Sequence, residues 1–151
     1  MAAEIRLPLQ WDSDQDLAYL RLGSLGDEEI QTVTCDIAQG SVLLVMDVGV
    51  SSHRIAGFEV VPASAAFSWM TVEQREDAIA KLEVDVDWAW ADVRLFQDPT
   101  HPSEIVPFRC EGVPGVFGCI GGGGRNVRGF RIPDPKNRLP ERLVAALNRD
   151  G

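Results

Sequence analysis

The segment that organises this chain is VLLVMDVGVSSHRIAGFEVV, residues 42–61. Two apolar runs, 42–46 and 55–61, flank a polar turn that contains Gly49 and two serines. Apolar runs of this length on either side of turn-forming residues are typical of two strands joined as a β-hairpin. The sequence therefore predicts a hairpin at this position.

A second stretch repeats the hairpin pattern near the end of the chain. Residues 116–132 read VFGCIGGGGRNVRGFRI, so that Gly129 and Phe130 stand 72 positions after Gly57 and Phe58. Four pairs of blocks match in the same order along the chain, among them the pair 9–22 and 82–95, so the sequence predicts an internal duplication. In that pair, fourteen residues from position 9 match fourteen from position 82 at Leu9/Leu82, Asp12/Asp85, Asp14/Asp87, Ala18/Ala91, Arg21/Arg94 and Leu22/Leu95.

Strand patterns precede the first hairpin, and a helix pattern follows each hairpin. The predicted strands, which rest on alternating apolar residues, cover 5–11, 17–22 and 30–37. Thr71 and Gln74 have the spacing of a capping box, which predicts a helix over 71–82. Pro140 suits the first turn of a closing helix over 139–149.

Together these patterns predict an α+β fold with two antiparallel β-meanders, each followed by a helix. The first repeat is expected to cover residues 1–82, and the second, more diverged repeat residues 83–151. A chain of 151 residues suits one compact domain. We therefore expect the two repeats to pack against each other as one pseudo-dimeric unit.

The charge of the chain narrows the class of partner. Its formal net charge is −9, which repels phosphate backbones and disfavours nucleic acid as a partner. Residues 1–82 hold 13 acidic and 5 basic side chains, whereas residues 83–151 hold 10 acidic and 9 basic ones. This asymmetry suggests that the two halves present different surfaces and do different work.

Apolar runs in this sequence are short. None approaches the ~20 residues that a membrane-spanning helix needs, and the N-terminal segment lacks the apolar region of a signal peptide. We therefore expect a cytoplasmic protein with no membrane partner.

The cysteines, histidines and glycine run form no catalytic or cofactor signature. The chain has three cysteines, Cys35, Cys110 and Cys119, without the C-x-x-C spacing of a zinc site. His53 and His101 both fall in predicted turns. The glycines at 121–124 lack the Lys-Ser/Thr that follows a phosphate loop, and they align with the turn of the first hairpin. We therefore expect no catalytic residue, metal or cofactor.

Two groups of carboxylates are the candidates for a partner-binding surface. They are Asp12, Asp14, Asp16, Glu83, Asp85 and Asp87. The first three imitate the start of a calcium loop, but Leu17 and Gly23 occupy positions that an EF-hand reserves for Gly and Glu. Acidic side chains of this kind also cap turns, so both a solvated turn and an acidic face that attracts a basic partner remain open.

Three functional hypotheses follow from these observations. The first is a non-catalytic acidic interaction module. A narrower alternative is an immunity-type or antitoxin-type inhibitor of a basic enzyme. The third is a small hydrolase or metal-dependent enzyme that uses the carboxylates of Asp12, Asp16, Asp47 and Glu59.

The first half also resembles a known family. The stretch WDSDQDLAYLRL, residues 11–22, together with Asp47 and RIAGFEVV, residues 54–61, resembles the small bacterial domain-of-unknown-function family numbered 2283. The resemblance implies a small α+β fold and no particular activity. It covers residues 9–62, and it reaches residues 82–133 only through the internal repeat.

The second half departs from this resemblance at the polar positions. The internal alignment pairs Asp16 with Ala89, Tyr19 with Asp92, Asp47 with Cys119 and Glu59 with Arg131. A task that depends on these polar groups in one half therefore cannot be performed by the other.

Overall fold

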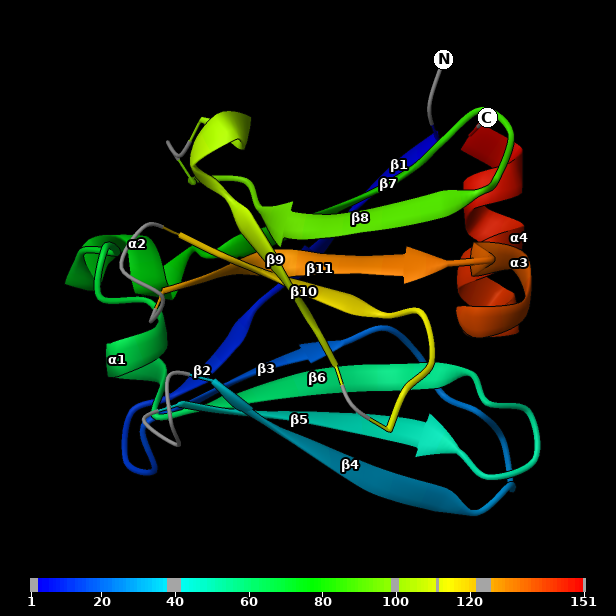
Figure 1. Ribbon diagram of the computed structural model, residues 1–151, viewed down its shortest axis with the longest axis horizontal. Coiled ribbons are helices and arrows are strands. Elements are labelled where there is room, and N and C mark those ends of the chain that lie inside the picture. The colour runs from blue at the N-terminus through cyan, green and yellow to red at the C-terminus, as the bar shows by residue number, and fades with distance from the viewer. Residues whose placement is uncertain (1–2, 38–41, 99–100, 111, 122–125, 151) are drawn as a thin grey trace.

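The protein consists of two antiparallel sheets with short helices at their ends, as Figure 1 shows. The structure is a computed structural model and describes residues 3–37, 42–98, 101–110, 112–121 and 126–150. Sheet A contains, in spatial order, β1 (Ala3–Pro8), β7 (Ile79–Val84), β8 (Trp90–Leu95), β11 (Val127–Pro133), β10 (Phe117–Ile120) and β9 (Val106–Arg109). Sheet B contains β2 (Gln10–Asp12), β3 (Leu17–Arg21), β6 (Ile55–Val61), β5 (Val42–Gly49) and β4 (Ile30–Ile37).

The helices lie at the two ends of the sheets and leave their outer faces uncovered in the described part of the chain. α1 (Ala63–Ala66) and α2 (Val72–Glu76) lie at one end, and α3 (Pro135–Arg138) and α4 (Glu141–Asp150) lie at the other (Figure 1). A single 3-10 turn, η1 (Pro102–Glu104), precedes β9. None of these described helices has the length and apolarity that crossing a membrane would need. The expected α+β class, built mostly of antiparallel strands, is confirmed.

The predicted hairpin is confirmed. β5 and β6 pair antiparallel, with Met46 opposite Phe58 and a register shift between Asp47 and Val48. The inward side chains of both strands are buried, including Leu44, Met46 and Phe58. The corresponding β10–β11 hairpin is also present, but residues 122–124 of its predicted glycine turn lie outside the described residues.

The strands are not arranged as simple meanders, which corrects the predicted order. In sheet B, β4, β5 and β6 form a meander, but the β2–β3 hairpin attaches to β6 and not to β4. The connection 22–29 between β3 and β4 is long enough to carry the chain to the far edge of the sheet, so β4 does not have to pair with β3. In sheet A, β9, β10 and β11 form the meander, and β7–β8 attaches to β11 in the same way.

The two sheets agree in residue register as well as in strand order. Phe58 lies opposite Leu20, and Phe130 lies opposite Val93. The register shift after Asp47 in β5 has a counterpart after Cys119 in β10. Five strands of sheet A thus follow the plan of sheet B, with β1 added at one edge.

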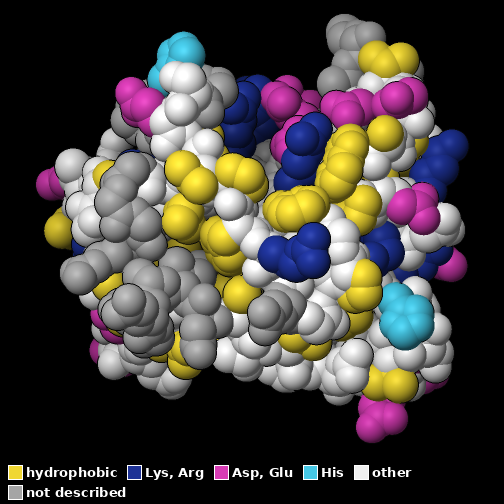
Figure 2. All heavy atoms as spheres, in the orientation of Figure 1, with side chains coloured by type: hydrophobic (Ala, Val, Ile, Leu, Met, Phe, Trp, Pro, Cys, Tyr) yellow, Lys and Arg dark blue, Asp and Glu magenta, His cyan; other side chains and the backbone are white. Residues whose placement is uncertain are grey.

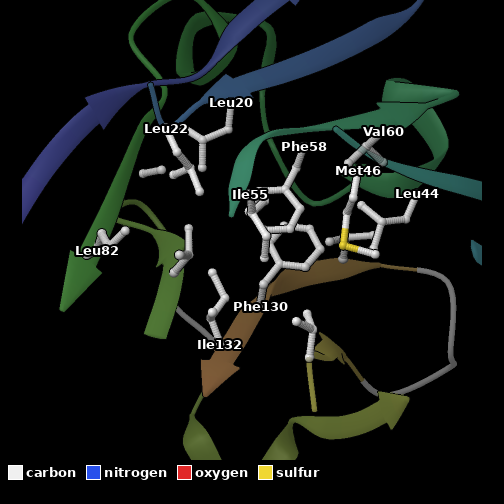
Figure 3. Packing of buried hydrophobic residues seen from close by; sticks show 14 of the residues in the cluster. Leu20, Leu22, Leu44, Met46, Ile55, Phe58, Val60, Leu82, Phe130 and Ile132 are labelled. Carbon is white, nitrogen blue, oxygen red and sulfur yellow. The ribbon is translucent and has the colours of Figure 1, made fainter. Parts of the chain in front are cut away.

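The core lies between the sheets and centres on two aromatic rings. Phe58 from β6 and Phe130 from β11 stack with a centroid separation of 4.2 Å and an interplanar angle of 2°. Figure 3 shows the pair between the two sheets, surrounded by aliphatic side chains that include Leu20, Leu82 and Ile132. Both rings are buried.

The predicted first strand is in fact two strands in different sheets. β1 pairs with β7 in sheet A, whereas β2 pairs with β3 in sheet B. The chain crosses between the sheets at Leu9, whose N–H donates to the carbonyl of Ala78 at 2.9 Å. One alternating pattern runs through both strands because each buries its alternate residues in the same core, so the break leaves no signal in the periodicity.

The predicted helix over 71–82 is too long. Its capping box is present, since Thr71 and Gln74 exchange both hydrogen bonds, but α2 ends at Glu76. From Ile79 the chain forms β7, and the alternate residues Ala80, Leu82 and Val84 are buried. Burial on one face of a sheet therefore overrides the apparent helical spacing. The closing helix is confirmed as α4, which follows Pro140.

Candidate functional site

The first group of candidate carboxylates shapes the turn between β2 and β3. Asp12 accepts hydrogen bonds at Oδ1 from the backbone N–H groups of Asp14 and Gln15, at 3.1 and 3.2 Å. Asp16 accepts one from the N–H of Ser64 at 2.8 Å and another from the Ser64 hydroxyl. Asp12 therefore stabilises the turn itself, Asp16 joins the turn to α1, and Asp14 is exposed.

The second group lies at the opposite end of the molecule. Glu83 in β7 forms an ion pair with Lys81 at 2.5 Å. Asp87, in the turn to β8, accepts a hydrogen bond from the N–H of Ala89 at 3.2 Å, and Asp85 stands in the same turn. The β2–β3 turn lies beside α1, whereas the β7–β8 turn lies at the α3 and α4 end (Figure 1). The six candidate carboxylates are therefore not brought onto one face.

Sheet B instead presents a different polar group on its outer face. We define the acidic patch as Tyr19, Asp47 and Glu59, from β3, β5 and β6. The Tyr19 hydroxyl donates to Asp47 Oδ2 at 3.4 Å. Glu59 lies directly opposite Tyr19 in the β3–β6 register. All three side chains are half-buried.

A glycine makes the geometry of the acidic patch possible. Gly57 lies in β6 between Arg21 of β3 and Asp47 of β5. A Cβ atom at Gly57 would lie 2.5 Å from the Tyr19 hydroxyl oxygen and 2.7 Å from the carbonyl oxygen of Leu20. The absence of a side chain therefore lets the Tyr19 ring lie across β6 and reach Asp47.

The electrostatics of the patch favour a neutral tyrosine. Burial raises the pKa of Tyr19 above 10.0, and the charge and hydrogen bond of Asp47, with a smaller effect of Glu59, raise it further. Arg21 opposes this shift. Tyr19 is therefore a hydrogen-bond donor at neutral pH, and the negative charge of the patch comes from its two carboxylates.

The equivalent face of sheet A mixes charges of both signs. Arg131 Nε contacts Asp92 Oδ1 at 3.2 Å, and its guanidinium lies 4.6 Å from the centre of the Trp90 ring. Burial raises the pKa of Asp92, while Arg131 lowers it and Asp85 and Glu83 raise it. Figure 2 shows acidic, basic and hydrophobic side chains interspersed in the upper part of the view, where sheet A lies in Figure 1.

Burial holds two of the three cysteines, Cys110 and Cys119, as neutral thiols. Burial raises the pKa of the Cys110 thiol to about 12. Burial, followed by the charge of Asp92, also raises the pKa of Cys119. Cys35 is buried in β4, opposite Leu44 of β5. His53 lies in the turn after Gly49, and Gly49 pairs with Ile30, which is five residues before Cys35 in β4. The structure therefore does not assemble a Cys35–His53 pair.

The four carboxylates of the proposed enzyme site belong to two places. Asp12 and Asp16 bond to backbone at the α1 end, while Asp47 and Glu59 lie on the outer face of sheet B. Among the described residues, no three side chains of His, Cys, Asp or Glu are grouped so that they could hold a metal ion.

The sequence reasoning missed a pocket on the outer face of sheet A. It has a volume of about 210 Å³. Its lining includes Glu83, Asp92, Arg94, Ile105, Cys119 and Gly129. The internal alignment contained a sign of this pocket. It pairs Tyr19 with the shorter Asp92, while Gly57 is matched by another glycine, Gly129.

Comparisons with protein-family models, curated proteins and solved structures gave no match for this chain. The resemblance to the family numbered 2283 therefore stays a prediction.

Proposed function

We propose that the protein is a non-catalytic binding module made of two copies of one strand-and-helix unit. Support for the duplication comes from equal strand order, equal registers across Leu20–Phe58 and Val93–Phe130, and register shifts at equivalent positions. The sequence boundary between residues 82 and 83 falls within β7. On this proposal the second copy begins with β7, and the stacked phenylalanines lie where the two copies meet.

The binding surface in this proposal is the acidic patch on sheet B. The observation that carries it is that the patch lies half-buried on the outer face of sheet B, while the described helices lie at the ends of the sheets. Residues 10–61, which form sheet B, hold nine acidic side chains and two arginines, a balance of −7. Residues 79–133, which form most of sheet A, hold seven acidic and six basic side chains, a balance of −1. A basic partner is therefore drawn to sheet B.

The patch is suited to binding more than to catalysis. Its tyrosine donates to the carboxylate of Asp47 and Glu59 lies alongside, so the patch presents carboxylate acceptors to a partner. Fixed charges of this kind favour association rate and specificity. An immunity-type or antitoxin-type inhibitor of a basic enzyme is the narrower form of the same proposal.

Amide chemical-shift mapping with a short polylysine peptide tests the location. Shifts are expected in β3, β5 and β6 around Tyr19, Asp47 and Glu59, and they should disappear in the double variant Asp47→Asn/Glu59→Gln. The matched control is Asp85→Asn/Asp87→Asn, which removes the same charge at the β7–β8 turn and should leave the shifts in place. If both double variants lose the peptide-induced shifts to the same extent, the net charge of the protein, and not the acidic patch, attracts the peptide.

A further inference from the structure

We propose that the pocket on the outer face of sheet A binds the tyrosine side chain of a partner protein. The pocket lies where sheet B places the ring of its own Tyr19. This site is on the opposite sheet from the acidic patch, so its failure would leave the proposal for sheet B standing.

The correspondence between the two places follows from the registers. Tyr19 lies opposite Glu59 in β6, and Asp92 lies opposite Arg131 in β11. Two pairs further along, Arg21 lies opposite Gly57, and Arg94 lies opposite Gly129. The equivalent positions are therefore Gln10/Glu83, Tyr19/Asp92, Arg21/Arg94, Gly57/Gly129 and Asp47/Cys119, and the second member of every pair lines the pocket.

The bare glycine explains why a flat ring fits. On sheet B, the Tyr19 ring covers Gly57 and its hydroxyl reaches the next strand. On sheet A, the atoms nearest to a Cβ placed at Gly129 belong to Val93 and Arg94, so no aromatic ring covers this glycine, and Gly129 lines the pocket. An aromatic ring placed against Gly129 gains apolar contact with the backbone of β11 and with Ile105, which also lines the pocket.

The polar lining selects a phenol over a purely apolar ring. Asp92 lines the pocket and offers carboxylate oxygens that accept a hydrogen bond. Cys119 occupies the position that Asp47 holds beside the Tyr19 hydroxyl in sheet B. Burial raises the pKa of Cys119, so its thiol is neutral and can act as a weak acceptor for a phenol hydroxyl. A tyrosine therefore finds apolar contact for its ring and an acceptor for its hydroxyl in one place.

The direct test is a titration of the whole protein with N-acetyl-tyrosinamide, followed by amide chemical shifts. Saturable shifts are expected at Asp92, Cys119 and Gly129, with N-acetyl-leucinamide binding at least about tenfold more weakly, since tenfold corresponds to about 1.4 kcal/mol. N-acetyl-phenylalaninamide should fall between the two. The absence of saturable shifts at these residues in the wild-type protein would overturn the proposal.

A reciprocal pair of variants sharpens the test. Asp92→Tyr restores the residue of sheet B, fills the pocket from within, and should weaken binding by at least about tenfold. Tyr19→Asp uncovers Gly57 and should create new shifts around Gly57 and Asp47. Undiminished binding to a folded Asp92→Tyr variant would contradict the proposal.

A measurement on the unaltered protein covers the case in which Asp92→Tyr fails to fold. Cys119 is half-buried in the pocket, whereas Cys35 and Cys110 are buried. N-acetyl-tyrosinamide should slow the alkylation of Cys119 by iodoacetamide, and N-acetyl-leucinamide at the same concentration should not. Equal alkylation rates with both compounds would overturn the proposal.

Discussion

Tyr19 and Gly57 show how one residue pair determines the character of a sheet face. The tyrosine ring is held over the strand because glycine leaves room for it, and its hydroxyl then donates to Asp47. In sheet A the corresponding positions of the register hold Gly129 and Asp92, and both residues line a pocket. The same backbone therefore carries a filled acidic patch on one side and an open pocket on the other.

The pKa of Tyr19 gives a direct probe of this arrangement. Tyr19 is the single tyrosine in the chain, so the near-ultraviolet absorbance of phenolate reports on it without interference from another tyrosine. Because burial and Asp47 disfavour the phenolate, we expect a titration midpoint above 10.0. Asp47→Asn should lower the midpoint, and an unchanged midpoint would show that Asp47 does not act on the phenol.

The same shift predicts a pH dependence of stability. The folded state holds the Tyr19 proton more tightly than the unfolded state, since the folded pKa is raised above 10.0. This contribution to stability is complete below pH 10.0 and is lost as the pH rises through the folded pKa. Tyr19→Phe should therefore have a flatter profile of unfolding free energy above that pH, measured by urea melts. Parallel profiles for the two proteins would contradict the assignment.

At the scale of elements, short-range patterns were predictable and long-range choices were not. The β5–β6 hairpin and the Thr71 capping box depend on neighbouring residues, and both are confirmed. The switch of sheet at Leu9 and the attachment of β3 to β6 depend on contacts between distant segments. The acidic patch could not be predicted from the sequence for the same reason, because its three side chains come from three different strands.

Arg54 links the first hairpin to the C-terminal helices. Its Nη1 donates to the carbonyl of Lys136 at 3.0 Å and also to the carbonyl of Leu139, where α3 ends. Hydrogen bonds with a charged donor contribute about 1.5–3 kcal/mol each, so Arg54→Met should lower the unfolding free energy by about 2 kcal/mol or more. Arg142→Met, an exposed position on α4, is the matched control and should change stability by about 0.5 kcal/mol or less. Equal effects of the two variants in urea melts would show that Arg54 does not join these elements.

At the scale of the whole molecule, the two sheets are held together through the Phe58–Phe130 stack. Removing either ring leaves a cavity at the centre of the core, so Phe58→Ala and Phe130→Ala should each cost about 3–5 kcal/mol. Because the rings lie 4.2 Å apart, the double variant should cost less than the sum of the two single ones. Additive effects in a double-mutant cycle of urea melts would contradict a direct coupling of the two sheets.

The central functional claim is that two sheets of one plan carry different outer faces, and that the acidic patch of sheet B attracts a basic partner. The most direct test is the affinity of polylysine for the variant Asp47→Cys/Glu59→Arg, which gives sheet B the residues that sheet A has at Cys119 and Arg131. We expect the wild-type affinity to fall steeply with added salt, and the variant to bind at least about tenfold more weakly at low salt. Equal affinities of the folded variant and the wild-type protein, with the same dependence on salt, would contradict the claim.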